Sequence, residues 1–373
     1  MKELLESLDI QGNRRHLINA LTTQKYIFFE NKQYLNFSSN DYLALSDTLL
    51  QKEFIKNLDF EGEFLLSNPS SRLMTGNSYH YDELETTISK LYGKEAALVL
   101  SSGFMLNSGV LPAITKEGDL IVADKLVHAS IIDGLRLCKC DFKRFRHNDL
   151  VDLKKILERE KPKGAIYIVT ESIFSMDGDI APLCELIEIK KKYGAKLYVD
   201  EAHAFGVRGC GGLGVAQELG VIDDIDYLVA TFGKALASQG AFVACDYLSR
   251  EVMINKMRTL IFSTALPPIS LMWSKFLIEK LSSFTDRRER ISRSINILNE
   301  NNIVCSSHIV PILIGDNFKT LEAAQKLKEG GIWCSAIRQP TVPKGTERLR
   351  LSITAAFDDD DIKSLVNQVV SII

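Results

Sequence analysis

The stretch Lys196-Leu-Tyr-Val-Asp-Glu-Ala-His203 decides the fold, because an apolar run ends there in acidic and imidazole side chains. A second stretch, Asp226-Tyr-Leu-Val-Ala-Thr-Phe-Gly-Lys234, has the same form and ends in a glycine and a lysine. Both runs are typical of buried strands, so Asp200, His203 and Lys234 are expected at or just past strand ends. In open α/β sheets, ligands bind at that edge.

Short apolar runs alternate with helical patterns on both sides of these stretches. Strands are predicted at 97–100, 120–124, 142–146, 165–171, 196–200, 227–231 and 241–244. Helices are predicted at 105–114, 128–137, 150–159 and 182–193. This alternation predicts an α/β fold with a mostly parallel seven-stranded sheet covered by helices. The last two strands are joined too tightly for a helical crossover, so one of them is expected to run antiparallel.

The composition indicates a soluble cytoplasmic protein. The chain has 373 residues, 46% of them apolar, and a net charge of −3, which does not suit a nucleic-acid groove. Its seven cysteines form no Cys-x-x-Cys pair, as expected of free thiols in a reducing cytosol. The first 17 residues lack the apolar core of a signal peptide, and no run of about 18 apolar residues predicts a membrane span.

The lysine and the aspartate match the requirements of pyridoxal 5'-phosphate, which needs a Schiff-base lysine and an acid against its pyridinium nitrogen. Asp200 would keep that nitrogen protonated, because an adjacent opposite charge favours both ionised forms. Lys234 would form the Schiff base and act as the base at the substrate's α-carbon. His203 could bond the phenolic oxygen, and Thr231 could bond the phosphate. A surface lysine and a helix-capping aspartate are the alternative, which either residue alone would favour.

Other strand ends carry further candidates. Ser101-Ser-Gly-Phe104 opens a predicted helix, where free amide groups can bind a phosphate, although an ordinary helix cap is the alternative. His128 is placed to stack on the cofactor ring, unless it only caps the next helix. Ser175, which follows another strand, could bond the phosphate or the ring oxygen.

Two other site types are not predicted. Gly209-Cys-Gly-Gly-Leu-Gly214 matches Gly-x-Gly-x-x-Gly, but a dinucleotide site needs the first glycine directly after a strand, and this glycine lies nine residues beyond Asp200. We interpret it as a glycine-rich loop. No metal-binding motif occurs, so no metal is expected.

Arginines are the candidates for carboxylate binding, since the guanidinium group forms a planar fork. Arg350 is predicted to bind the carboxylate of an amino acid, and Arg348 is expected to face the other way. Arg14 and Arg338 are candidates for a second, distal carboxylate, with surface ion pairing as the alternative for each.

The chain resembles the α-oxoamine synthases, pyridoxal-phosphate enzymes of the aspartate-aminotransferase fold (fold type I), over nearly its whole length. The resemblance rests on the following stretches: Asn36-Phe-Ser-Ser-Asn-Asp-Tyr-Leu43, Ser71-Arg-Leu-Met-Thr-Gly-Asn-Ser78, Ser102-Gly-Phe104, His128-Ala-Ser130, Glu171-Ser-Ile-Phe-Ser-Met-Asp-Gly178, Asp200-Glu-Ala-His203, Thr231-Phe-Gly-Lys234 and Phe262-Ser-Thr-Ala-Leu-Pro-Pro268.

The resemblance implies roles for individual residues. It implies cofactor contacts for Gly103, Phe104, His128, Ser175, Asp200, His203, Thr231 and Lys234. The substrate positions that it implies are Arg14, Asn40, His128 and Thr341. Ser263 and Thr264 match residues that reach the phosphate held by a partner subunit, so a homodimer with shared active sites is expected.

The stretch Ala336-Ile-Arg-Gln-Pro-Thr-Val-Pro-Lys-Gly-Thr-Glu-Arg-Leu-Arg350 narrows the resemblance within the family. It favours a decarboxylative condensation of L-alanine with a pimeloyl thioester of coenzyme A or of an acyl carrier protein. The alternatives are another family member, such as a glycine acetyltransferase, an aminotransferase, and a scaffold that only binds the cofactor. Gln339, Ala204 and the loop 237–239 depart from the usual family pattern.

The expected organisation has three parts. Residues 1–40 form an N-terminal arm, residues 41–280 a large cofactor-binding domain, and residues 281–373 a small α+β C-terminal domain. One strand of the small domain is expected at 333–337. The boundary before the small domain follows the stretch Thr264-Ala-Leu-Pro-Pro268.

Overall fold

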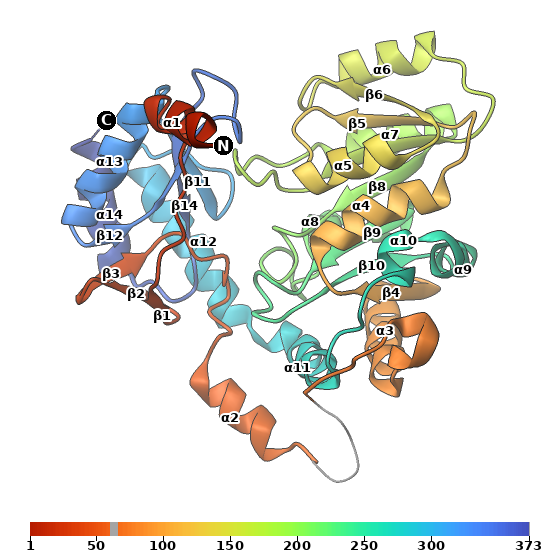
Figure 1. Ribbon diagram of the computed structural model, residues 1–373, viewed down its shortest axis with the longest axis horizontal. Coiled ribbons are helices and arrows are strands. Elements are labelled where there is room, and N and C mark those ends of the chain that lie inside the picture. Colours follow the sequence, from red (N-terminus) through yellow and green to blue (C-terminus); the bar gives the residue numbers. More distant parts are fainter. Residues whose placement is uncertain (60–65, 373) are drawn as a thin grey trace. The chain divides into compact units, whose positions relative to one another are not determined.

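The apolar runs form one seven-stranded sheet in the computed structural model, which describes residues 1–59 and 66–372. The strand order is β4-β10-β9-β8-β7-β5-β6 (Figure 1). The strands are β4 (Ala96–Leu100), β5 (Leu120–Asp124), β6 (Asp141–Phe145), β7 (Ile166–Glu171), β8 (Lys196–Asp200), β9 (Tyr227–Thr231) and β10 (Ala241–Cys245). The predicted strands are confirmed, each within one residue at either end.

The sheet is parallel apart from one strand. β10 runs antiparallel to both of its neighbours, β9 and β4, and the pairs from β6 to β9 are parallel. This confirms the expected antiparallel strand and identifies it as β10. The parallel strands therefore bring their carboxyl ends to one edge.

The helices of this sheet unit begin at recognisable caps. The Ser102 hydroxyl accepts a hydrogen bond from the Met105 amide, so α4 begins at Gly103, two residues before the predicted start. His128 and Pro182 are the residues before their helices, which begin one residue later than predicted. The helices are α2 (Thr48–Lys56), α3 (Tyr79–Tyr92), α4 (Gly103–Ile114), α5 (Ala129–Leu137), α6 (Leu150–Arg159), α7 (Leu183–Tyr193), α8 (Val215–Glu218), α9 (Tyr247–Lys256), α10 (Arg258–Ile261) and α11 (Pro268–Glu279).

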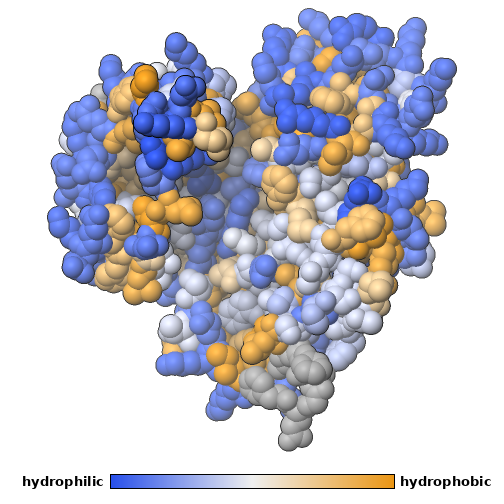
Figure 2. Space-filling model, viewed as in Figure 1, coloured by the Kyte–Doolittle hydropathy of each residue, from blue (hydrophilic) through white to orange (hydrophobic). Residues whose placement is uncertain are grey.

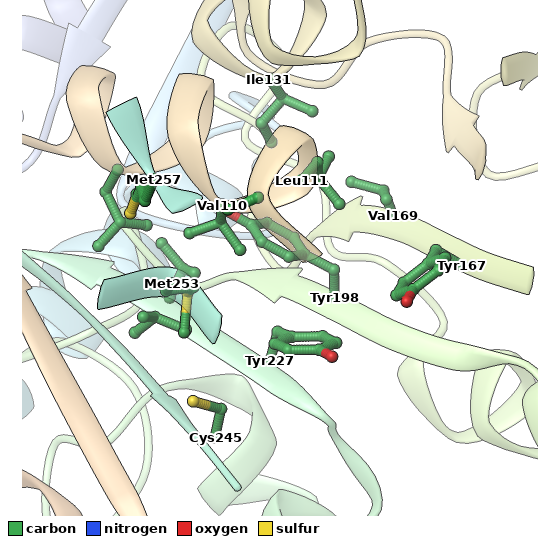
Figure 3. Packing of buried hydrophobic residues seen from close by; sticks show 14 of the residues in the cluster. Val110, Leu111, Ile131, Tyr167, Val169, Tyr198, Tyr227, Cys245, Met253 and Met257 are labelled. Carbon is green, nitrogen blue, oxygen red and sulfur yellow. The ribbon is translucent and has the colours of Figure 1, made fainter. Parts of the chain in front are cut away.

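One face of the sheet packs against α4, α5, α9 and α10. Tyr167, Tyr198 and Tyr227 rise from three adjacent strands into this apolar layer, beneath the helix that carries Val110 and Leu111 (Figure 3). Burying a large apolar side chain contributes about 1.5–3 kcal/mol relative to leaving it exposed. This layer therefore holds the strand ends in a rigid frame.

A second compact unit comprises residues 1–47, 175–179 and 286–373, while residues 48–174 and 180–285 form the sheet unit. Its sheets have the orders β1-β2-β3-β12 and β11-β14-β13. The strands are β1 (Leu21–Thr22), β2 (Tyr26–Phe29), β3 (Lys32–Asn36), β11 (Ile309–Leu313), β12 (Ile332–Trp333), β13 (Ser335–Ile337) and β14 (Arg348–Ser352); the helices are α1 (Lys2–Ile10), α12 (Thr285–Glu300), α13 (Asn317–Glu329) and α14 (Asp359–Val370).

The smaller α+β region at the C-terminal end is thus confirmed, with one difference in detail. The single strand expected at 333–337 is two strands, β12 and β13, which belong to different sheets. The division into domains at 1–40, 41–280 and 281–373 stays a prediction.

The glycine-rich loop after β8 serves a structural purpose. Glu201 is fully buried, and its carboxyl accepts hydrogen bonds from the Ser172 hydroxyl and from the amides of Val215 and Ala216. Burial raises the pKa of Glu201 to about 7. Gly214 has a φ of +104°, and a Cβ there would lie 2.5 Å from the Glu201 carboxyl. The loop therefore closes over a buried acid.

We expect the substitution Gly214→Ala to lower the free energy of unfolding, measured by urea denaturation. The strained φ costs about 1–3 kcal/mol, and the overpacking costs about 1–3 kcal/mol more. Gly220→Ala is the matched control, since Gly220 also has a positive φ, of +67°, but a Cβ there meets no atom of the described residues within 4 Å. Equal losses in the two variants would contradict the close contact with Glu201.

Candidate active site

Lys234 and His203 face each other beyond the ends of β9 and β8. The Lys234 Nζ lies 2.8 Å from the His203 Nε2. His203 is buried and Lys234 is partly buried. An amine held against an imidazole can exchange a proton with it, and a partly desolvated amine is a nucleophile for a carbonyl.

Asp200, at the end of β8, is held as an acceptor of two hydrogen bonds. Its side chain is only 4% exposed. The Oδ1 accepts from the Ala202 amide at 2.9 Å, and the Oδ2 accepts from the Asn107 side-chain amide at 2.7 Å. Donors to both oxygens favour the ionised carboxylate, which can pair with a cationic ring nitrogen.

His128 lies at the start of α5. Its Nδ1 accepts from the Ser130 amide at 3.2 Å and lies 2.7 Å from the Ser130 hydroxyl. The ring is exposed toward the cavity, yet desolvation by the surrounding protein lowers the pKa of His128, against the opposing effect of Asp200. A neutral imidazole that bonds through Nδ1 carries its proton on Nε2.

The start of α4 offers room for an anion. Among the residues that the structure describes, a Cβ at Gly103 would meet only the Thr231 side chain, at 3.5 Å, and Phe104 is 52% exposed. The Thr231 hydroxyl donates to the Gly240 carbonyl at 3.0 Å and accepts from the Gly233 amide at 3.3 Å. The amides at the start of this 12-residue helix can bind a phosphate.

These groups line one cavity of about 170 Å³. The predicted residues that it brings together are Gly103, Phe104, His128, Asp200, His203, Thr231 and Lys234. Its other lining residues had no predicted role: Asn107, Ser130, Glu171, Ala202, Val229 and Ala230. The cavity thus combines an amine, two imidazoles and buried acids at the carboxyl edge of the sheet.

Glu171 is the most significant omission. It ends β7 directly beside Asp200 in the parallel register and is 3% exposed. Burial, and then the neighbouring Asp200, raise the pKa of Glu171 well above its usual value. Its Oε1 has no hydrogen-bond partner among the described residues. Its place at the end of a predicted strand, like that of Asp200, was the available signal.

Ser263 and Thr264 lie elsewhere on the sheet unit. The Thr264 carbonyl accepts from the Ser101 hydroxyl at 3.2 Å, and both residues line a small cavity with Ser101 rather than the cavity of Lys234. Their role toward a partner subunit stays a prediction.

The second unit brings two predicted site residues, Asn40 and Ser175, together around Arg350. Its guanidinium group donates to the Ser175 carbonyl at 2.6 Å, to the Asn40 Oδ1 at 3.4 Å and to the Tyr42 hydroxyl at 3.3 Å. The expectation for Arg348 was wrong. Residues two apart in a strand share a face, and Arg348 accordingly contacts Asp177, close to the Ser175 contact of Arg350.

The remaining candidates in this unit lie near the N-terminal segment. Arg14 forms an ion pair with Asp9 at 2.6 Å, which agrees with the alternative prediction of a surface ion pair. Arg338 donates to the Gly12 carbonyl, and Arg15 donates to the Thr341 hydroxyl at 2.7 Å. Participation of Arg14, Asn40, Ser175, Arg338, Thr341 and Arg350 in one site with Lys234 stays a prediction.

Within 1–59 and 66–372, no three His, Cys, Asp or Glu side chains are grouped so that they could hold a metal ion. In the same part of the chain, no helix has the length and apolarity needed to cross a membrane.

The fold and the cavity define a class of protein. The sequence pattern of the family "Aminotransferase class I and II" matches residues 32–369, and the chain belongs to this family. This agrees with the predicted fold type I architecture.

Particular relatives narrow the comparison. The chain is 46% identical to 8-amino-7-oxononanoate synthase of Haemophilus ducreyi over 98% of both chains. Serine palmitoyltransferase from S. paucimobilis, solved with a PLP–myriocin aldimine, is similar with a TM-score of 0.90 and 28% identity over 100% of this chain and 96% of that one. The 8-amino-7-oxononanoate synthase of Francisella tularensis gives a TM-score of 0.76 and 27% identity over 91% and 97%.

We expect Glu171→Gln to make the stability of the cofactor-free protein depend less on pH. The folded protein keeps Glu171 protonated above 4.5, its ordinary pKa, whereas the unfolded chain loses that proton. The free energy of unfolding of the wild type therefore falls as the pH rises through this range. Glutamine has no such proton. The difference in free energy of unfolding, variant minus wild type, should therefore be more positive at pH 8 than at pH 5.

The measurement is urea denaturation at both pH values. Glu83→Gln, on the exposed surface of α3, is the control. A Glu171→Gln difference from the wild type that is the same at pH 5 and pH 8 would show that Glu171 ionises normally.

Proposed function

We propose that this protein condenses L-alanine with a pimeloyl thioester to give 8-amino-7-oxononanoate, carbon dioxide and the free thiol, a reaction of biotin biosynthesis. The observation that carries the proposal is the single cavity in which Lys234 and His203 lie 2.8 Å apart beside the buried Asp200. The 46% identity to an 8-amino-7-oxononanoate synthase over nearly the whole chain supports the choice of reaction.

The cavity residues fit pyridoxal 5'-phosphate. Lys234 would hold the aldehyde carbon, Asp200 the ring nitrogen and His203 the phenolic oxygen. His128 would stack on the ring, and Gly103, Phe104, Ser175 and Thr231 would contact the cofactor, with the phosphate at the start of α4. When bound, the cofactor supplies an electron sink for the charge that develops at the α-carbon of the amino acid.

The protein's own residues bind, orient and move protons in this reaction. Lys234 takes the proton from the α-carbon of alanine at its Nζ, and His203 fixes the direction of that amine. The α-carbon then bonds to the thioester carbonyl carbon, and the thiolate leaves. The alanine carboxyl departs as carbon dioxide, and Lys234 returns a proton to the same carbon. Holding the two substrates together can lower the barrier by about 7–11 kcal/mol.

Arginines would select the two carboxylates. Arg350 is 6% exposed and gathers Asn40, Ser175 and Tyr42 around one guanidinium group, as suits a preorganised site for the alanine carboxylate. Arg14, Arg338 and Thr341 would receive the distal carboxylate of the pimeloyl chain. Burial and the nearby Arg15 lower the pKa of Arg338, and a bound carboxylate would relieve that repulsion.

A homodimer with shared active sites completes the proposal. Figure 2 shows an apolar patch over α9 and α10, where Leu248 and Phe262 are exposed. Exposed apolar patches mark interaction sites. Ser263 and Thr264 follow Phe262 directly and would then reach the phosphate held by the partner. We place this enzyme in the cytoplasm, with small-molecule substrates and without nucleic-acid or membrane partners.

A second candidate is another α-oxoamine synthase, such as a glycine acetyltransferase or a serine palmitoyltransferase. The TM-score of 0.90 to serine palmitoyltransferase favours this alternative. We prefer the alanine reaction because 46% sequence identity reflects side chains, whereas the fold is common to many chemistries.

Thiol release by the cofactor-loaded protein tests the reaction. We expect release with L-alanine and pimeloyl-coenzyme A, together with a product of the mass of 8-amino-7-oxononanoate. Glycine with acetyl-coenzyme A and L-serine with palmitoyl-coenzyme A should release none. Lys234→Ala should lose more than about 10³-fold in rate, because it removes the proton acceptor.

Release only with glycine or serine would replace the proposed substrates by those of the second candidate. If no coenzyme A ester gives thiol release, the same assay is repeated with pimeloyl-acyl carrier protein. The absence of thiol release from that donor as well would contradict the proposed reaction.

We expect Arg338→Leu to raise the KM for pimeloyl-coenzyme A by about 10–100-fold, the usual worth of a hydrogen bond to a charged group. Heptanoyl-coenzyme A has the same chain without the distal carboxylate, so its KM should not change. Arg159→Leu, at the exposed end of α6, is the control. An equal rise in KM with both esters would show that Arg338 does not bind the distal carboxylate.

A further inference from the structure

Asn107 is a buried polar residue of α4, the helix that covers the apolar layer of the sheet. It is 4% exposed and is surrounded in its helix by buried residues such as Leu106 and Val110. A buried amide costs free energy unless its hydrogen-bonding groups have partners. Among the described residues, the Asn107 side chain bonds to three polar groups, the Tyr198 hydroxyl, the Ser130 hydroxyl and the Asp200 carboxylate, and these bonds fix its orientation.

The direction of the Asn107 amide follows from Tyr198. The Tyr198 hydroxyl is fully buried and donates to the Asn107 Oδ1 at 2.5 Å. Burial raises the pKa of Tyr198 well above its usual value, so this hydroxyl remains a donor. The Asn107 oxygen therefore faces Tyr198 (whose ring Figure 3 shows in the layer below α4), and its amide nitrogen faces away.

The two protons of that nitrogen reach two different functional groups. One is donated to the Asp200 Oδ2 at 2.7 Å, and the other to the Ser130 hydroxyl oxygen at 3.2 Å. Because the Ser130 oxygen accepts from Asn107, its own proton is available for the His128 Nδ1 at 2.7 Å, where it adds to the Ser130 amide, which donates to the same nitrogen at 3.2 Å. Every donor thus points one way, from Tyr198 through Asn107 to Asp200 and to His128.

We propose that Asn107 is a positioning residue that holds Asp200 as an ionised acceptor and, through Ser130, fixes His128 as the tautomer with its proton on Nε2. The inference deepens the proposed function, since Asp200 would face the cofactor nitrogen and His128 the cofactor ring. One amide thereby sets the charge on one side of the cofactor and the orientation of the ring beside it.

The first measurement is NMR of the cofactor-free protein labelled with ¹⁵N-histidine. The wild type should show His128 with the proton on Nε2, assigned by its loss in His128→Asn. Asn107→Leu, which keeps the volume of the side chain, should give a mixture of tautomers. Ser130→Ala should shift the tautomer in the same direction, because it removes the hydroxyl that lies 2.7 Å from the His128 Nδ1 and leaves the Ser130 amide, at 3.2 Å, as the donor there.

The second measurement is pyridoxal phosphate affinity, from the absorbance of the bound cofactor. Asn107→Leu should weaken binding by about 10–100-fold, since Asp200 loses a hydrogen bond to its charge. Ser130→Ala should bind within about threefold of the wild type, because Asn107 still reaches Asp200. The matched control is Ser108→Ala, which removes a buried hydroxyl that, among the described residues, donates to the Phe104 and Met105 carbonyls of its own helix and should change neither readout.

Asn107→Leu with a wild-type tautomer and wild-type affinity would overturn the proposal. Tyr198→Phe covers the case in which Asn107→Leu does not fold, because it removes only the bond that orients the amide. Tyr198→Phe and Ser130→Ala that both match the wild type in both readouts would also overturn it. Neither readout uses an amino acid or a thioester, so an error in the proposed substrates leaves them unchanged.

Discussion

Parallel pairing of β7, β8 and β9 is the constraint on which the whole cavity depends. The register places Glu171 beside Asp200 and Asp200 beside Val229, so the residues after these three strands emerge side by side. His203 and Lys234 follow from two of them, and their contact needs no further element. Two more lining residues come from the segments that follow β4 and β5. Gly103 is the first residue of α4, and His128 directly precedes α5.

This edge concentrates acids that cannot all be ionised in a buried place. Asp200 receives two N–H donors, whereas Glu171 has an oxygen with no partner among the described residues. Burial, and then the neighbouring Asp200, raise the pKa of Glu171 well above its usual value. The two neighbouring carboxyls thus differ in their hydrogen bonding, and both oxygens of Asp200 are held as acceptors at the place where a cationic ring would lie.

The sequence predicted what depends on period and on strand ends. The seven strands, the lysine and the acid at the edge follow from apolar runs that stop at polar residues. Asn107 and Ser130 were not predicted, because each lies in a helix with an apolar pattern and bonds to residues from other elements. The error at Arg348 was one of strand geometry. The split of 332–337 was missed because an apolar run does not show that Cys334 separates strands of two sheets.

The pairing of β3 with β12 has a consequence for synthesis on the ribosome. Leu35 pairs with Ile332, so the strand partner of the N-terminal segment is made nearly 300 residues later. At typical elongation rates of about 5–20 residues per second, that segment waits roughly 15–60 s for its partner. During this interval the β2–β3 hairpin has an open strand edge, and open edges invite pairing with other chains. In this stage the open edge of the N-terminal segment can pair with another nascent chain on a neighbouring ribosome. Chaperone binding to the same segment would compete with that pairing.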